Sequence, residues 1–190
     1  LEAENAYTDA ALSHLAPLRE RLFEEIRGRV RETDASTPVR KDGYEYFSRT
    51  REGLQYAIHC RRPAGTPGLP APDAEPGTDD GEVVLLDENA LAGDSGYFAL
   101  GAFSPTPDQA RLAYSTDFTG GERYTLRVRD VATGDDLIDE ISDTYYGVAW
   151  ANDGETLFYT RPDDAMRPWQ VWRHRLGTPV GDDVLVFQED

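Results

Sequence analysis

The chain has 190 residues, which suits one medium-sized domain or a smaller domain with an appendage. Its 36 acidic and 19 basic residues give a net charge of −17, and such a surface disfavours binding to a nucleic-acid backbone. This charge would attract a cationic peptide. A compositional bias of the source organism is nevertheless the favoured explanation, because Lys41 is the only lysine in the chain.

Cysteine content and hydropathy bear on the cellular compartment. The single cysteine, Cys60, excludes an internal disulfide, and the absence of an 18-residue apolar run predicts no membrane-spanning helix. Residues 1–5 lack the basic-then-apolar pattern of a signal peptide. They also lack an initiator methionine, so we expect that the chain was processed or excised from a longer one. Together these features favour a cytoplasmic location without a membrane partner.

The first 35 residues are expected to form a helical arm, which we assign to residues 1–40 as a separate unit. Pro17 suits the first turn of a helix and predicts a break and restart near residues 13–16. The residues from Thr33 to Pro38 are expected to end the helix. One apolar stripe recurs at spacings of three and four: Leu15, Leu18, Leu22, Ile26 and Val30. This stripe requires a partner surface.

From Tyr44 onward the hydrophobic pattern alternates with a period of two, which is typical of strands. Short segments rich in aromatic and β-branched residues are separated by turn-forming residues and lie at 44–48, 55–60, 82–86, 111–115, 124–129, 156–160 and 170–174. Between them, residues 63–81 are dominated by Pro, Gly, Ala and Asp. They predict a long, flexible surface loop in which disorder would be tolerated.

An internal repeat is the most informative feature of this β region. Residues 112–115 match residues 157–160 at a displacement of 45, and residues 126–129 match residues 171–174 at the same displacement. Each unit also has an entry segment and a fourth short strand, at 101–105 and 137–138 in one copy and at 147–151 and 184–187 in the other. Four strands in about 45 residues are typical of a propeller blade. A sandwich with coincidental spacing is the alternative.

The three earliest strands, at 44–48, 55–60 and 82–86, make a weaker third copy. Residues 41–190 are therefore expected to form a partial β-propeller of about three blades. Known propellers need about four to eight blades to close, so the sequence implies missing chain. A truncated array would expose an apolar blade face, which makes self-association of the fragment possible.

Candidate catalytic residues are few and scattered. Residues 93–96 read Gly-Asp-Ser-Gly, as in the nucleophile segment of trypsin-like proteases, but turn formers directly before a strand favour a loop. A Gly-x-Ser-x-Gly nucleophile elbow is absent. His14, His59 and His174 lie far apart in the sequence, and the last two are expected to be structural positions within strands.

Four Asp-Asp pairs and the single cysteine are the other residues with catalytic potential. The pairs are interpreted as solvated loop residues rather than catalytic carboxylates: Asp79-Asp80, Asp135-Asp136, Asp163-Asp164 and Asp182-Asp183. Cys60 precedes two arginines that could lower its pKa, yet its strand position favours a buried structural thiol. Metal-binding spacing is missing. We therefore predict no catalytic, cofactor-binding or metal-binding residue in this chain.

Several segments resemble a known family. Residues 17–29 are similar to the N-terminal arm of the oligopeptidase B (protease II) group in the prolyl oligopeptidase family of serine peptidases. Residues 43–62, 148–159 and 171–178 are similar to blades of the same group, whereas the loop after Pro63 is longer than usual. The resemblance covers nearly the whole chain in order. It implies a mainly β fold: an N-terminal helical arm followed by about three four-stranded blades of a seven-bladed propeller.

The resemblance also implies a function. Members of this family carry a C-terminal α/β-hydrolase domain with Ser, Asp and His, which this chain lacks. They cleave short peptides, after Arg or Lys in the oligopeptidase B group. It implies that this part gates and filters substrates and that its arm contacts the missing catalytic domain. The alternative is a non-enzymatic β-propeller that serves as a protein-interaction module.

Overall fold

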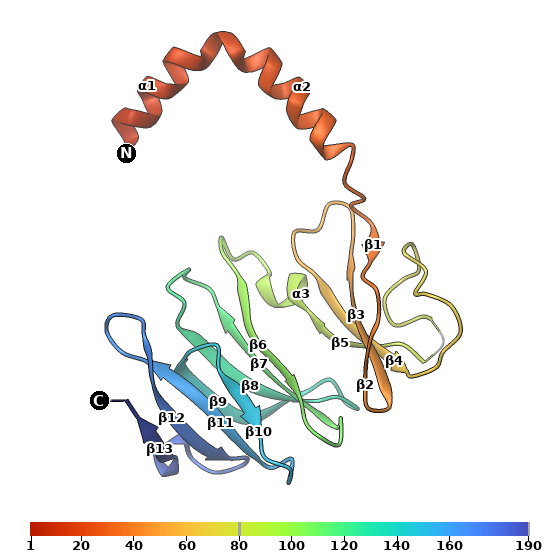
Figure 1. The fold of residues 1–190 in the computed structure, drawn as a ribbon, viewed down its shortest axis with the longest axis vertical. Coiled ribbons are helices and arrows are strands. Elements are labelled where there is room, and N and C mark those ends of the chain that lie inside the picture. Colours follow the sequence, from red (N-terminus) through yellow and green to blue (C-terminus); the bar gives the residue numbers. More distant parts are fainter. Residues whose placement is uncertain (80, 190) are drawn as a thin grey trace.

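The computed structural model describes residues 1–79 and 81–189, and it confirms a mainly β fold. A bent helical arm leads into three antiparallel sheets that stand side by side as successive blades (Figure 1). Among the described residues, no helix is both long enough and apolar enough to cross a membrane.

The arm contains two helices with a short 3-10 turn between them. Helix α1 spans Glu2–Leu12, η1 spans Ser13–Leu15 and α2 spans Ala16–Arg27, so the predicted break is confirmed at the turn that precedes Pro17. The expected end of the helix was wrong. Helix α2 ends at Arg27, because Gly28 disfavours continuation and the following chain leaves to pair with a sheet.

The first sheet, blade 1, is built from five strands. They are β1 (Asp34–Ala35), β2 (Val39–Lys41), β3 (Tyr44–Thr50), β4 (Ile58–Pro63) and β5 (Val83–Asp87). Both β1 and β2 pair with β3, β1 at one end of that strand and β2 at the other. Strands β1 and β2 therefore belong to the first sheet, although their residues fall almost entirely within the expected arm. The division of the chain into an arm of residues 1–40 and a propeller of residues 41–190 stays a prediction.

One strand of blade 1 is shifted relative to the sequence expectation. The strand expected at residues 55–60 begins at Ile58 and extends to Pro63. The backbone amide of Tyr56 instead donates a hydrogen bond to Oδ1 of Asn89 (2.9 Å). In return, the side-chain Nδ2 of Asn89 donates to the backbone carbonyl of Tyr56 (3.0 Å). This side-chain clamp holds the residues before Ile58 in a loop.

The next two sheets each have four strands in sequence order. Blade 2 contains β6 (Ala99–Pro105), β7 (Arg111–Asp117), β8 (Tyr124–Asp130) and β9 (Asp136–Thr144). Blade 3 contains β10 (Val148–Trp150), β11 (Thr156–Pro162), β12 (Pro168–Arg175) and β13 (Val184–Gln188). A short helix, α3 (Glu88–Ala92), links blades 1 and 2, and η2 (Val180–Asp182) precedes β13. The three repeated units are confirmed as blades.

Blade 2 packs on both neighbours because its strand side chains alternate between the two faces. Leu112 and Tyr114 pack with Leu85 and Leu86 of blade 1. The residue between them, Ala113, points the other way. It joins the cluster formed with blade 3: Ala113, Leu126, Val128, Ile141, Leu157 and Tyr159.

Equivalent turns in blades 2 and 3 each accept a hydrogen bond from an arginine of the preceding blade. Gln109 and Gly154, which are 45 residues apart, both have positive φ, at 64° and 66°. Arg61 of blade 1 donates from Nη1 to the carbonyl of Gln109 (2.6 Å), and Arg111 of blade 2 donates from Nη1 to that of Gly154 (3.0 Å). The repeat thus sets the spacing between blades through backbone carbonyls as well as through apolar packing.

Candidate docking surface

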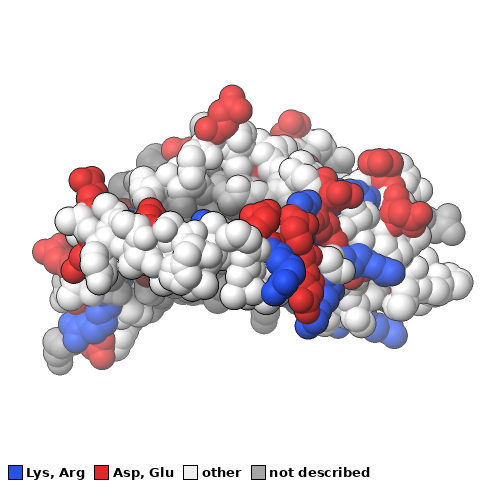
Figure 2. Space-filling view, turned by 90° about the horizontal axis from the view of Figure 1, so that it is seen from above, with Lys and Arg blue, Asp and Glu red and all other residues white. Residues whose placement is uncertain are grey.

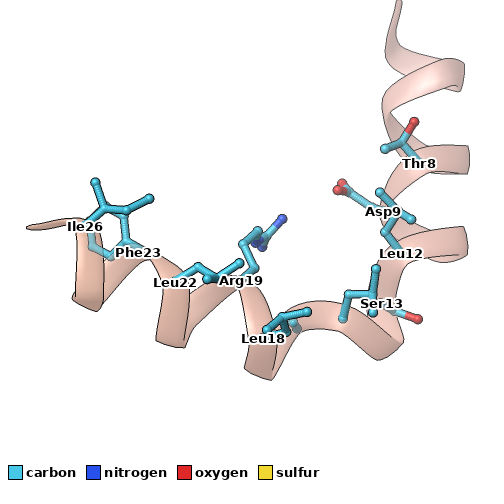
Figure 3. A pocket seen from close by; sticks show the side chains of 11 residues that line it. Thr8, Asp9, Leu12, Ser13, Leu18, Arg19, Leu22, Phe23 and Ile26 are labelled. Carbon is cyan, nitrogen blue, oxygen red and sulfur yellow. The ribbon is translucent and has the colours of Figure 1, made fainter.

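The inner side of the bent arm forms an apolar groove of about 710 Å³. Figure 3 shows Leu12 of α1 and Leu18, Leu22, Phe23 and Ile26 of α2 along this side. The bend at η1 brings the two helical segments to either side of the hollow. Polar groups at its margin come from Thr8, Asp9, Ser13 and Arg19.

The apolar side chains of the groove are packed against little other protein and remain exposed to solvent. The exposed fractions rise from 40% at Leu18 to 63% at Ile26, and none of the described residues of α1 and α2 is buried. Isolated helices this short are marginal in water, so their stability must come from packing of the apolar side. Covering the remaining exposed area of each of these side chains would contribute about 1 kcal/mol.

Charged side chains gather away from the groove, over the end of α2 (Figure 2). Nε of Arg27 donates to Oε1 of Glu32 (2.7 Å), and Glu32 raises the pKa of Arg27. Arg29 pairs with Glu25 one helical turn earlier. These exposed pairs stabilise the helix end modestly, so the apolar groove is the part of the arm suited to a partner.

A second apolar feature, which we call the aromatic rim, lies at one end of blades 1 and 2. Its exposed members are Tyr97, Phe118 and Tyr146, each 44–45% exposed. Phe98 stacks edge-on with Phe118 at 5.4 Å between ring centroids, and Tyr146 contacts Tyr145 at 4.6 Å. The rim residues come from loops between β5 and β6, β7 and β8, and β9 and β10.

The loop that carries Phe118 is held by Asp117. Oδ1 of this buried carboxylate accepts the Thr119 amide (2.7 Å) and Oδ2 accepts the Glu122 amide (2.9 Å). Burial opposes its ionisation, yet these hydrogen bonds keep the pKa of Asp117 below its usual value. A charged, fully bonded Asp117 therefore fixes the position of an exposed aromatic ring.

The arm leaves the blades at the end that carries the rim. Strand β1 pairs with the last two residues of β3, and the Glu52 amide donates to Oγ1 of Thr33 (3.0 Å) just before β1. Tyr56, in the loop after β3, stacks on Phe98 of the rim at 5.3 Å. Figure 1 shows the arm arching over this end of the sheets. The groove and the rim therefore face a common space.

The three histidines differ in burial and in their contacts. His14 is exposed on the arm. His59 contacts Oε1 of Glu88 (2.6 Å) and stacks near Phe103, beside the link between blades 1 and 2. His174 is fully buried in β12 and His59 is partly buried in β4, so both lie within strands as expected.

His174 lies at the centre of a buried cluster between blades 2 and 3. Its Nε2 is 3.0 Å from Oδ1 of Asp139 in β9, and its Nδ1 is 2.6 Å from Oδ1 of Asp183. A ring that carries both N–H groups can donate to both carboxylates. Asp139 also accepts the Gly177 amide (2.6 Å), and Asp183 accepts the Tyr159 hydroxyl (2.9 Å).

The interpretation of the acidic pairs as solvated was wrong for Asp183, whereas the side chains of Asp79 and Asp136 stay 29% and 32% exposed and also bind distant partners. The side chain of Asp183 is only 2% exposed, in the cluster with His174. Asp136 accepts hydrogen bonds from Arg129 and from Tyr114, and with burial it raises the pKa of Tyr114 to about 12. Asp79 pairs with Arg49 at 2.8 Å. Their partners lie 7 to 30 residues away, beyond any turn pattern.

The remaining acidic pairs have local or undescribed surroundings. Oδ1 of Asp163 accepts the amides of Ala165 and Arg167, which makes it a turn residue as expected. Asp80 lies outside the described residues. Residues 93–96 follow α3 as a loop in which Oγ of Ser95 hydrogen-bonds the Tyr97 carbonyl, again as expected.

Cys60 is the buried structural thiol that its strand position predicted. It is 1% exposed, in contact with Phe47 and Ile58, and burial raises its pKa. The two arginines that follow it are engaged elsewhere, Arg61 with Gln109 and Arg62 with Glu45. These two arginines therefore do not lower the pKa of Cys60 below its usual value.

The last blade has an exposed apolar strand, as the truncated-array hypothesis predicted. In β13 the apolar side chains are 42–57% exposed: Val184, Leu185, Val186 and Phe187. On the same blade, a shallow groove is lined by Val148, Phe158 and Val171. Blade 3 therefore carries exposed apolar side chains both on its last strand and in this groove.

Comparison with known proteins gives a consistent result along the chain. Residues 1–190 match the family model described as prolyl oligopeptidase, N-terminal beta-propeller domain. Dipeptidyl aminopeptidase BI of Pseudoxanthomonas mexicana is 38% identical, and Protease 2 of Moraxella lacunata is 36% identical, over 100% of this chain. The chain spans 27% of the length of each of these relatives.

Solved structures show the same likeness. Oligopeptidase B from Leishmania major superposes with a TM-score of 0.84 at 29% identity, over 97% of this chain and 25% of the other. Oligopeptidase B from Trypanosoma brucei, in a closed form with covalently bound antipain, gives a TM-score of 0.83 at 33% identity. That match covers 98% of this chain and 25% of the other.

Proposed function

This chain belongs to the family of prolyl oligopeptidase N-terminal β-propeller domains, and from this we propose that it is the propeller portion of a longer serine peptidase. The whole polypeptide would hydrolyse short peptides after basic residues, with its catalytic residues in a domain beyond this chain. The part described here would contact that domain and limit which substrates reach it.

The arm carries this proposal. Its apolar groove is open and it arches over the blade end that bears the aromatic rim. A second domain seated in this space would cover the groove and the rim together. Closure of two domains around a substrate excludes water and limits substrate size, which is how a propeller without catalytic residues can contribute to peptidase selectivity.

Docking of the arm can be tested by limited trypsin digestion. Arg19, Arg21 and Arg27 lie on α2, and in the isolated chain we expect rapid cleavage after them because the helix is unsupported. In the full-length polypeptide the same bonds should be protected by on the order of 10-fold or more. Equal cleavage rates in the two forms would contradict docking of the arm.

The substrate class requires a separate measurement. The acidic character of the chain, with a net charge of −17, supports entry of basic peptides. For the full-length polypeptide we expect higher kcat/KM on short peptides with Arg or Lys before the scissile bond than on matched peptides with Pro. The preference should weaken as salt is added. A preference for Pro would refute the basic specificity while leaving the docking proposal intact.

A further inference from the structure

One face of blade 1 is buried although no other blade of the described chain covers it. The alternation of β3 and β4 directs Tyr46 and Arg61 toward blade 2, and Phe47, Arg49 and Cys60 to the opposite face. These three side chains are nevertheless only 0–5% exposed. Something other than a blade therefore excludes water from this face.

The covering segment is the loop between β4 and β5, residues 64–82, of which all but residue 80 are described. Figure 1 shows this loop on the flank of blade 1 that faces away from blade 2. Its Pro70 is buried, and Glu82 at its end is 6% exposed. We call this segment the cap.

Arg49 is the central anchor of the cap. Its Nε and Nη2 donate to the two carboxylate oxygens of Glu82 (2.8 and 2.5 Å), and Nη2 also donates to Asp79 (2.8 Å). Its Nη1 donates to the Ala71 carbonyl (2.6 Å), so three separate points of the cap converge on one guanidinium. Burial opposes ionisation of Glu82, but the hydrogen bonds from Arg49 and from the Gly77 amide keep its pKa below the usual value.

Two more arginines of blade 1 hold the cap at other points. Arg62 donates from Nη2 to the Gly68 carbonyl (2.6 Å), while its Nε pairs with Glu45 (2.9 Å). Arg51 donates from Nη1 to the Pro72 carbonyl (2.6 Å) and from Nη2 to that of Ala74. Backbone carbonyls of a loop are thus bonded by cations of the sheet, which meets the hydrogen-bonding needs of the covered backbone.

The glycine content of the cap is required by this path. Gly65, Gly68, Gly77 and Gly81 all have positive φ, a conformation that L side chains rarely adopt. A Cβ added to Gly81 would lie 2.9 Å from Cδ of Pro63. The Pro- and Gly-rich composition therefore encodes a specific packed path. The flexibility expected for residues 63–81 stays a prediction. Any such movement would have to break the hydrogen bonds from Arg49, Arg51 and Arg62.

We propose that the described residues of the cap, 64–79 and 81–82, take the place of a neighbouring blade on the free face of blade 1. The cap makes the two ends of the blade array unlike. Blade 3 exposes an apolar face that a further blade can cover, whereas blade 1 covers its own face. A blade that closes a ring would meet the outer surface of the cap, and its departure would leave Phe47 and Cys60 covered. This inference stands without the proposed function.

Cys60 provides a direct measurement, because it is the chain's only cysteine and lies beneath the cap. In the full-length polypeptide, alkylation of Cys60 by iodoacetamide can be followed by mass spectrometry of its peptide. We expect Glu82→Gln, which removes the charge partner of Arg49, to accelerate alkylation by on the order of 100-fold. Hydrogen exchange in peptides from β7 and β11 should stay unchanged, since only the cap opens.

A second anchor variant separates opening from thiol acidity, because Glu82 is also close to Cys60. Arg51→Met removes the hydrogen bonds to the Pro72 and Ala74 carbonyls of the cap and leaves Glu82 in place, and it should accelerate alkylation by about 10-fold. Arg123→Met, which breaks an exposed pair with Asp143 and a hydrogen bond to the Asp163 carbonyl, both away from the cap, is the matched control and should leave the rate unchanged.

Two results would overturn the proposal. One is an unchanged alkylation rate in Arg51→Met, whatever Glu82→Gln does. The other is a wild-type alkylation rate that rises with urea along the same curve as hydrogen exchange in blades 2 and 3. The second result would mean that the cap opens only when the whole propeller unfolds.

Discussion

Replacing both Leu18 and Leu22 with aspartate is expected to lower kcat/KM of the full-length polypeptide for a short basic peptide by on the order of 100-fold. Both residues line the apolar groove of the arm. In the docked state two carboxylates would be buried against apolar surface without partners, and the arm would be released instead. If the arm docks as proposed, its release would leave the active-site domain less well enclosed.

Arg21→Asp is the matched control for this double variant. Arg21 lies on α2 but does not line the groove, so the same new side chain should leave activity close to wild type. Circular dichroism and the urea midpoint of the propeller should be alike in both variants, because the arm contributes no buried residue to the blades. Wild-type activity in the double variant would contradict a role for the groove.

Replacing His174 with leucine is expected to destabilise blades 2 and 3 by about 3–5 kcal/mol. The substitution leaves the carboxylates of Asp139 and Asp183 buried without the ring that lies between them. Each keeps one other donor, Gly177 or Tyr159, but neither keeps its hydrogen bond to the ring. Hydrogen exchange of peptides from β9, β11 and β12 in the full-length polypeptide measures this loss locally.

Two further variants show whether the loss comes from uncompensated charge. Adding Asp139→Asn and Asp183→Asn to His174→Leu should recover part of the lost stability, because the buried charges are then removed. Arg175→Leu, one residue along β12, breaks only an exposed pair with Glu155 and should cost less than about 1 kcal/mol. Equal effects of His174→Leu and Arg175→Leu would contradict the cluster.

The sequence identified the arm and the blades because both depend on local periodicity. The stripe from Leu15 to Ile26 and the displacement of 45 residues were visible without any coordinates. The strand starts were less accurate where a distant side chain intervened. Asn89 holds Tyr56 in a loop across 33 residues, and no pattern near Tyr56 indicates this contact.

The candidate surface was predictable only in its helical half. The groove follows from the apolar stripe, whereas the aromatic rim combines Tyr97, Phe118 and Tyr146 from three different loops. Each ring taken alone resembles an ordinary exposed aromatic residue. The order of the strands places these loops at one end of the blades, and that order becomes visible only once the sheets have formed.

By itself, the sequence determined a helical arm with an unpaired apolar side and a repeating array of four-stranded blades, since both follow from residues close together in the chain. Only the tertiary structure decided the partners of the charged groups. Asp139 meets His174 across 35 residues, and Arg49 meets Glu82 across 33. Composition around Asp183 and residues 63–81 indicated solvated turns and a loose loop. Packing placed Asp183 beside His174 and folded the loop over blade 1, because burial of a charge depends on which distant partner is at hand.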